Sequence, residues 1–372
     1  MVGYSEVFNL IWKTCQKEWV DNKHPKGFFQ EMADNICLEK MDFVRFIAIA
    51  IIITFIRKGV AKYFLQPLAE KLNFDIKDRA NFPECTFKFI VYLLLYATEC
   101  VVLLSTYKEF LTDPRAPWKG WQVGMSVSPD LYWIYAAETG FYIHGIYGTI
   151  FMDIWRDDSV MLLLHHVLTI SLIVFSLGLR YHKIGLVVLF LHDIADVFLE
   201  FTKIIKCFQN REKSKKSIYS IITSLGFVFF ASAWIGCRIF IYPLIVLYST
   251  GYEARNELPD APFYFFFNGL LWILFCMNVW WSYFIILLIF RIIVGKSKSI
   301  EDTRELYVTE EQLLNSKKKD SLGETGEANA NEGEQKEAMT NGSFQNGVTQ
   351  NGVAHKHHNG AQKQENGVRK RN

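Results

Sequence analysis

Long apolar segments are the feature of this sequence that most constrains its fold. They alternate with short polar stretches, and hydrophobic residues make up 51% of the 372-residue chain. A bilayer core about 30 Å thick is crossed by roughly 20 apolar residues in a helix. Seven segments meet this requirement, near residues 43–64, 86–106, 131–152, 159–179, 184–205, 218–248 and 263–294. Alternation with a period of two is absent, so the sequence predicts an all-α polytopic membrane protein of about seven transmembrane helices.

The positively charged loops predict the orientation of these helices. Lys and Arg gather at residues 57–79, at Arg156 and at residues 203–216, and they are sparser in the loops between the other ends of the segments. The positive-inside rule places the richer loops in the cytosol. The N-terminus is then non-cytosolic and the C-terminus cytosolic, although several lysines in the N-terminal tail oppose this orientation. The sixth and seventh segments exceed one crossing, and Pro243 predicts a bend in the sixth.

Composition divides the chain into four parts. Residues beyond 316 are rich in Gly, Asn, Gln, Lys and Glu, and they repeat the triplet NGV. Such a segment buries too little apolar surface to fold by itself. The chain ends in RKRN, which resembles a dibasic signal for retrieval to the endoplasmic reticulum. We predict a non-cytosolic segment (1–42), a first transmembrane helix with a polar linker (43–85), a catalytic membrane domain (86–295) and a disordered cytosolic tail (296–372).

Ionisable side chains inside the predicted helices point to a functional site. Each costs about 2.5–3.5 kcal/mol at the bilayer centre even on mild scales, so each requires a reason. The densest group is LHDIADVFLE at 191–200, in which His192, Asp196 and Glu200 recur every four residues and share one helix face. The ionisable residues that we single out inside the predicted helices are Arg45, Glu99, Glu138, His144, His165, His166, His192, Asp193, Asp196, Glu200 and Arg238.

His165 and His166 lie in the fourth segment at a depth similar to that of the acidic stripe. The pair lies about 10 Å, and Asp196 about 15 Å, from the cytosolic ends of their helices at a rise of about 1.5 Å per residue. Adjacent helical side chains point about 100° apart, so the two imidazoles cannot perform the same task. One can face a reacting centre while a carboxylate holds the other.

Three explanations for the histidine pair remain open on these residues alone. The imidazoles can join helices by hydrogen bonds. They can bind a metal, although the HxxxH and HxxHH boxes of membrane desaturases are absent from the sequence. They can act as a nucleophile or a base that a carboxylate orients. The adjacent acidic stripe favours the third explanation, and we expect no metal site.

The motifs carry a family resemblance. HHVLTI, followed by RYHKIGLVVLFLHDIADVFLEFTKIIK, resembles the paired-histidine and HD-x-x-D signature of the ceramide synthases, the catalytic members of the TLC-domain family. The resemblance covers about residues 85–295 and includes RDDSVMLLLHH and the preceding FYIHGIYGT. The segment between the first two predicted helices, residues 65–85, is too short to contain the homeobox-like insert that many animal members carry. The chain is therefore most similar to the ceramide synthase 1 type, and no nucleic-acid binding is expected.

This resemblance implies a reaction and its participants. A fatty acyl group, of stearoyl length in this type, is transferred from acyl-CoA to the amine of a sphingoid base in the membrane of the endoplasmic reticulum. A thioester is already activated, so we expect no cofactor beyond the acyl-CoA co-substrate. The imidazole either carries the acyl group or acts as the base. The implied catalytic residues are His165, His166, Asp193 and Asp196, with His192, Glu200, Tyr142 and His144 in support.

Substrate binding and a rival function complete the predictions. The CoA phosphates require cations at the cytosolic mouth, for which Arg156, Lys203 and Lys206 are candidates. Arg238, which we also count among the substrate-binding residues, is expected to pair with Glu99 or Glu138. The acyl chain requires an apolar channel, and the family is thought to tune chain length in the loop at 249–262.

The alternative function is that of a non-catalytic TLC protein that binds or senses lipid or assists membrane insertion. Assembly as a homo- or heterodimer stays open.

Overall fold

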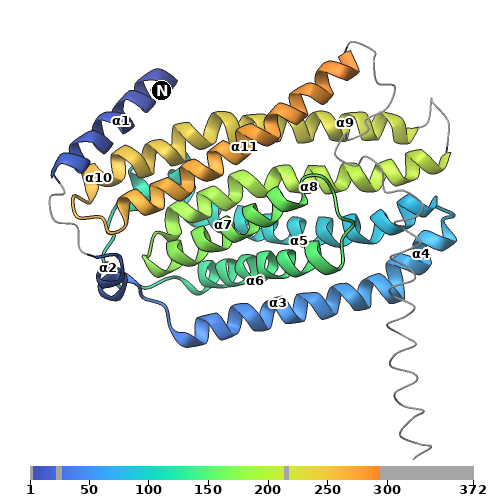
Figure 1. Ribbon diagram of the computed structural model, residues 1–372, viewed down its shortest axis with the longest axis horizontal. Coiled ribbons are helices and arrows are strands. Elements are labelled where there is room, and N and C mark those ends of the chain that lie inside the picture. The colour runs from blue at the N-terminus through green and yellow to red at the C-terminus, as the bar shows by residue number, and fades with distance from the viewer. Residues whose placement is uncertain (1–2, 22–26, 213–217, 294–372) are drawn as a thin grey trace, which may run out of the picture. The chain divides into compact units, whose positions relative to one another are not determined.

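The described residues form a bundle of long helices. The computed structural model describes residues 3–21, 27–212 and 218–293, and this part of the chain contains helices and no strand. The predicted all-α class is confirmed for it, whereas the predicted tail lies outside the described residues. The long helices, which lie side by side in Figure 1, are α3 (Lys40–Val60), α5 (Ile76–Thr106), α6 (Pro129–Phe151), α7 (Ser159–Gly178), α8 (His182–Glu212), α9 (Ile218–Ala233) and α11 (Tyr264–Ile293).

Shorter helices connect the long ones or pack at their ends. Two precede the first long helix, and most of the others occupy the turns between neighbours. They are α1 (Tyr4–Asp21), α2 (Phe28–Asn35), the π-helical η1 (Ala61–Leu65), α4 (Gln66–Lys71), the 3₁₀ turns η2 (Lys108–Leu111) and η3 (Ala116–Trp118), and α10 (Ala254–Glu257).

The sixth predicted segment has an unusual winding. After Ala233 the helix continues as three π-helical stretches, η4 (Trp234–Ile241), η5 (Pro243–Leu247) and η6 (Ser249–Glu253). We predicted a bend at Pro243; the π-helical winding begins nine residues before this proline and continues on both sides of it. π-helical turns are rare and occur frequently at functional sites. The first of these stretches carries Arg238.

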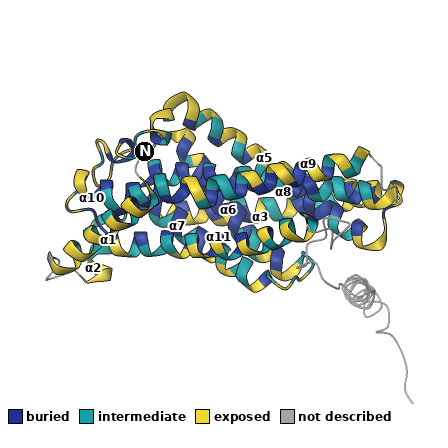
Figure 2. Ribbon diagram, turned by 90° about the horizontal axis from the view of Figure 1, so that it is seen from above, coloured by how far each residue is buried: buried dark blue, intermediate teal, exposed yellow. Residues whose placement is uncertain are grey.

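Packing separates an inner group of helices from an outer surface suited to lipid. α8 packs against α5 and α9, while α6 packs against α3 and α7. Figure 2 shows buried residues along the centre of the bundle and exposed ones around its periphery. Ile47, Ile51 and Phe55 project from α3, and Phe55 is 70% exposed. A contiguous apolar surface of this kind is typical of contact with a membrane.

Four helices in the described part are long and apolar enough to cross a membrane. They are α5, α7, the run from Ile218 to Glu257, and α11. α3, α6 and α8 carry more buried charge, such as Arg57, Glu138 and Asp193, but their 21, 23 and 31 residues are long enough for a bilayer about 30 Å thick. Seven crossings therefore stay a prediction.

An odd number of crossings places the two termini on opposite sides of the membrane. In sealed microsomes we expect an epitope after residue 320 to be digested by added protease and an epitope before Tyr4 to be protected. Detergent should expose both epitopes equally, which controls for intrinsic resistance. Protection or digestion of both ends in sealed vesicles would contradict seven crossings.

Candidate active site

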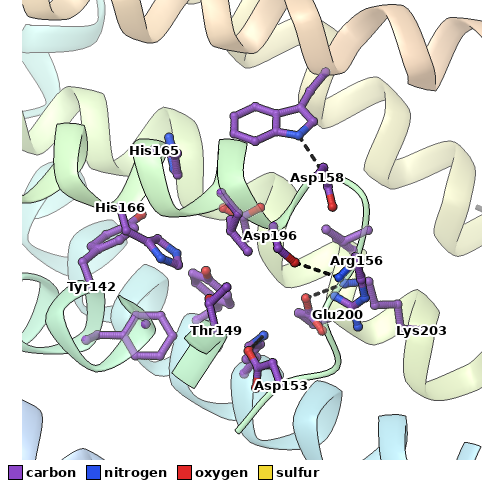
Figure 3. Close-up of a pocket in the computed structure, with 18 of the residues that line it drawn as sticks. Tyr142, Thr149, Asp153, Arg156, Asp158, His165, His166, Asp196, Glu200 and Lys203 are labelled. Carbon is purple, nitrogen blue, oxygen red and sulfur yellow. Dashed lines mark hydrogen bonds and ion pairs between the residues drawn. The ribbon is translucent and has the colours of Figure 1, made fainter. Parts of the chain in front are cut away.

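A polar cavity of about 160 Å³ lies between α3, α5, α6, α7, α8, α9, η4 and α11. Figure 3 shows the histidine pair and Tyr142 on one side of it, with Arg156, Glu200 and Lys203 on the other. It brings together most of the predicted site residues, namely Tyr142, His144, Arg156, His165, His166, Asp196, Glu200, Lys203 and Arg238. Asp193, His192 and Lys206 are not part of its lining.

A second, mostly apolar cavity of about 40 Å³ adjoins the polar one. It extends between α6, α7, α8 and α11, and leucine, isoleucine and valine side chains form much of its wall. Tyr142, His165 and Arg238 line both cavities, whereas His166 lines only the polar one. His165 therefore lies where a polar compartment meets an apolar one.

The two histidines have different surroundings. The ring of His165 packs edge to face against Trp281, with 5.4 Å between ring centroids. The ring of His166 covers Gly145 on α6, where an added Cβ would lie 3.0 Å from His166 Cε1. Tyr142 contacts both rings at centroid distances of 6.2 and 5.7 Å. Within the described residues, neither Nδ1 atom has a hydrogen-bond partner.

Arg238 bonds the acidic stripe of α8. Its Nη2 donates to Asp196 Oδ2 at 2.7 Å and to the carbonyl oxygen of His192 at 2.7 Å. Its guanidinium also stacks 3.9 Å from the ring centre of Trp234. The prediction that Arg238 pairs with Glu99 or Glu138 is therefore wrong. The π-helical turn directs the guanidinium toward α8 instead, and no hydrogen bond among the described residues joins Asp193 or Asp196 to the histidine pair.

His192 is held by hydrogen bonds at both ring nitrogens. Its Nδ1 lies 2.7 Å from the carbonyl oxygen of Val188, and its Nε2 lies 3.1 Å from Asn278 Nδ2. Because a carbonyl only accepts, Nδ1 carries the proton, and Nε2 accepts from the amide. This places His192 in a supporting position at the wall of the apolar cavity. Sequence reasoning missed Asn278, whose only signal was a carboxamide in an otherwise apolar helix.

His144 faces the polar cavity but bonds residues of α3. Its Nδ1 lies 2.8 Å from Thr54 Oγ1, and its Nε2 lies 3.4 Å from Arg57 Nη1. Gly148, one turn further along α6, leaves room for that guanidinium, because a Cβ there would lie 2.7 Å from Arg57 Nη1. His144 thus links α6 to α3 beside the cavity.

Asp193 belongs to a closed acidic group away from the cavity lining. It joins Glu99 of α5 and Glu138 of α6, and oxygens of the three carboxylates lie within 4.8 Å of one another. All three residues are fully buried, and no described residue outside the group donates a hydrogen bond to their six oxygens. Because Coulomb repulsion at this distance is strong in a buried site, the group requires protons or a cation to offset its charge. The expectation of no metal site stays a prediction.

Charged residues that sequence reasoning missed form the mouth of the polar cavity. Lys88 donates to Glu84 at 2.7 Å and to Asp153 at 2.8 Å, and Arg57 also bonds Asp153. Burial alone would raise the pKa of the Asp153 carboxyl, but attraction to Lys88 and Arg57 holds this pKa well below its usual range. We missed Glu84 because α5 begins ten residues before the predicted crossing, whereas Lys88 lies inside that crossing near its start and was passed over.

The predicted cations lie beside this network. Arg156 bonds Glu84 at 3.3 Å, and Lys203 bonds Glu200 at 2.9 Å. The mouth therefore gathers Arg57, Lys88, Arg156 and Lys203 around three carboxylates. If an incoming anionic group displaces one of these carboxylates, the cations can bind it by charge-assisted hydrogen bonds.

Comparison with known proteins identifies the family. Residues 81–287 match the TLC domain family. Ceramide synthase 1 of Homo sapiens is 39% identical over 261 residues, which cover 70% of this chain and 75% of that protein. The chain belongs to the ceramide synthase family. Ceramide synthase 1 of Mus musculus is 36% identical over 70% of this chain and 74% of its own length. Ceramide synthase 1 LOH3 of Arabidopsis thaliana is 30% identical over 67% and 83%, respectively.

Gly145 offers a test of the position of His166 in this ceramide synthase. We expect Gly145→Ala to lower the rate of acyl transfer about tenfold, because the new methyl group displaces the imidazole by a few tenths of an ångström. Gly59→Ala is the matched control, since a Cβ there meets no atom within 4 Å. Both variants are purified and their initial rates compared; equal rates would show that the position of the His166 ring does not limit turnover.

Proposed function

We propose that the protein is a sphingoid-base N-acyltransferase that transfers a fatty acyl group from acyl-CoA to the amine of sphinganine or sphingosine. One observation carries the proposal: His165 lies where the polar cavity joins the apolar cavity. An acyl-CoA likewise has a polar part and an apolar part, because its nucleotide portion and its acyl chain are joined at the thioester. The reacting carbonyl would then lie beside the imidazole.

The proposed reaction has two steps. Nε2 of His165 attacks the thioester carbonyl carbon, the C–S bond breaks, and the CoA thiolate takes the Nδ1 proton of the acylated ring and leaves as the thiol through the polar mouth. The amine of the sphingoid base then attacks the acyl-imidazole, forms the amide and returns the imidazole. The ammonium of the incoming base must first lose its proton, for which His166 and Asp196 are the acceptors in reach of the cavity. The half-buried position of His165 against Trp281 supports a lifetime long enough for the intermediate.

Arg238 can stabilise the oxyanion that forms in each step. Its guanidinium lines both cavities next to His165, and Asp196, the His192 carbonyl and Trp234 hold it in one orientation. A donor fixed before the reaction stabilises developing charge without reorganisation. We assign Asp196 to orient this guanidinium in addition to any role in proton transfer.

The cations at the mouth of the polar cavity can bind the phosphates of CoA. Arg57, Lys88, Arg156 and Lys203 present guanidinium and ammonium groups at one end of the polar cavity. Lys206 lies on α8 outside the lining and is kept only as a second, outer contact. No metal or organic cofactor is needed by this mechanism. We further propose a stearoyl-length acyl donor, residence in the membrane of the endoplasmic reticulum, and a cytosolic C-terminus.

An acyl-histidine should be trapped when the second substrate is withheld. The purified full-length protein, given acyl-CoA without a sphingoid base, is expected to gain one acyl mass on the peptide that contains residues 159–180. His165→Ala should abolish both this modification and acyl transfer, while His166→Ala should abolish transfer. If the peptide stays unmodified but product forms with both substrates, the histidines act as bases and the amine attacks the thioester directly.

The same assay separates catalysis from lipid binding. A non-catalytic TLC protein would bind acyl-CoA or a sphingoid base without forming an amide, in the wild type as in the histidine variants. Amide formation by the wild type that is lost in His165→Ala would exclude this alternative. Retention of labelled lipid by both proteins, with no amide in either, would favour it.

The Arg238–Asp196 pair can be tested for a role beyond stability. Asp196→Asn should lower turnover at least about 10²-fold and lower the melting temperature, because it leaves a buried guanidinium unpaired. Adding Arg238→Gln removes that charge and should restore the melting temperature without restoring turnover. Recovery of both quantities in the double variant would mean that the pair only stabilises the fold.

A further inference from the structure

The apolar cavity runs along α7 away from the reacting histidine. Its wall follows His165, Thr169, Leu172 and Ser176, a strip that extends for about 16 Å at a rise of about 1.5 Å per residue. α8 runs antiparallel and supplies the facing strip from His192 to Gly185. Distance from the imidazole along this cavity therefore corresponds to position along a bound acyl chain.

Tyr135 of α6 closes the far end of this cavity. Its side chain is fully buried, and its Oη lies 2.9 Å from the carbonyl oxygen of His182 and 3.0 Å from Ser176 Oγ. Because the carbonyl only accepts, the phenol donates to His182, and the hydroxyl of Ser176 donates to the phenol. These two bonds hold the ring tip between α7 and the start of α8.

Gly185 completes the closure from the side of α8. A Cβ at this position would lie 1.9 Å from Tyr135 Oη and 2.6 Å from Ser176 Oγ. The phenol oxygen therefore occupies the space that any other side chain at 185 would take. Three helices thus meet at one point, where the side chain of Tyr135 has no room to move toward α8.

We propose that Tyr135, fixed by Ser176 and seated against Gly185, forms the floor of the acyl channel and sets the maximum length of the transferred chain. The proposal rests on the proposed function, since it assigns the apolar cavity to the acyl group. An acyl chain that reaches the phenol cannot extend further without displacing a doubly hydrogen-bonded ring in a closely packed site. A single methylene changes discrimination in such a pocket by roughly 10–200-fold.

Tyr135→Leu should lengthen the channel. Wild type and variant are assayed with saturated acyl-CoAs of increasing even chain length and one sphingoid base, and kcat/KM is determined for each donor. Relative to the best donor of the wild type, the donor two carbons longer should gain about tenfold in kcat/KM in the variant. Tyr135→Phe, which removes only the oxygen, should shift the profile in the same direction by less.

Tyr181 provides the matched control. It is also a buried tyrosine near the end of α7, and its Oη donates to a backbone carbonyl, that of Pro262, at 2.9 Å. It does not line the apolar cavity, and it contacts the loop in which the family is thought to tune chain length. Tyr181→Leu and Tyr181→Phe should therefore keep the chain-length profile of the wild type.

A variant with the opposite effect tests the direction of the channel. Leu172 lies on the cavity wall between His165 and Ser176. Leu172→Phe should narrow the cavity before the floor and shift the best donor to a chain at least two carbons shorter. This variant decides the question if Tyr135→Leu does not fold, because it leaves the hydrogen bonds of the floor in place.

Each outcome bears on one proposal. Unchanged profiles in the folded Tyr135 variants and in Leu172→Phe, with acyl transfer retained, would overturn the floor while leaving the proposed function intact. An equal shift in the Tyr181 variants would also overturn it and assign chain length to the segment at 249–262, which Tyr181 contacts at Pro262. Failure of the wild type to acylate a sphingoid base with any donor is the separate failure of the proposed function.

Discussion

The ion pair between Arg238 and Asp196 joins the fifth and sixth predicted membrane helices beside the histidine pair. A guanidinium is costly to bury without a partner, so the pair constrains how α8 and η4 pack. The second hydrogen bond of Arg238 reaches the His192 carbonyl, and its face rests on Trp234. The π-helical winding of η4 accompanies this arrangement. The wall shared by the two cavities, and with it the surroundings of His165, depends on this pair.

Small residues on neighbouring helices determine where the two cavities begin and end. Gly145 lets His166 lie flat against α6, and Gly185 accepts the phenol of Tyr135 at the opposite end. Both glycines are helical, so their value lies in the missing Cβ and the resulting close approach of another side chain. A polar ring seated on a glycine thus occurs in the wall of the polar cavity, at His166, and at the closed end of the apolar cavity, at Tyr135.

Buried charge is arranged at two places with different consequences. At the mouth, cations and carboxylates alternate, so each is compensated and the group can exchange a carboxylate for another anion. Around Asp193 three carboxylates meet, and no cationic side chain among the described residues donates a hydrogen bond to them. Asp193 and Asp196, three residues apart on α8, therefore belong to different environments, and only Asp196 lines the polar cavity. Equal roles for the two aspartates are not supported.

The sequence by itself determined the all-helical class, the family and the depth at which histidines and acids gather, because these depend on the length, composition and spacing of single segments. It also named Asp196, Glu200 and Arg238, which line the same cavity as the histidine pair. Only the tertiary structure decided that Arg238 pairs with Asp196, that Asp193 turns toward Glu99 and Glu138, and that His165 alone of the pair borders both cavities. The physical reason is that periodicity fixes angles within one helix, whereas the rotation of each helix about its axis is set by packing against its neighbours.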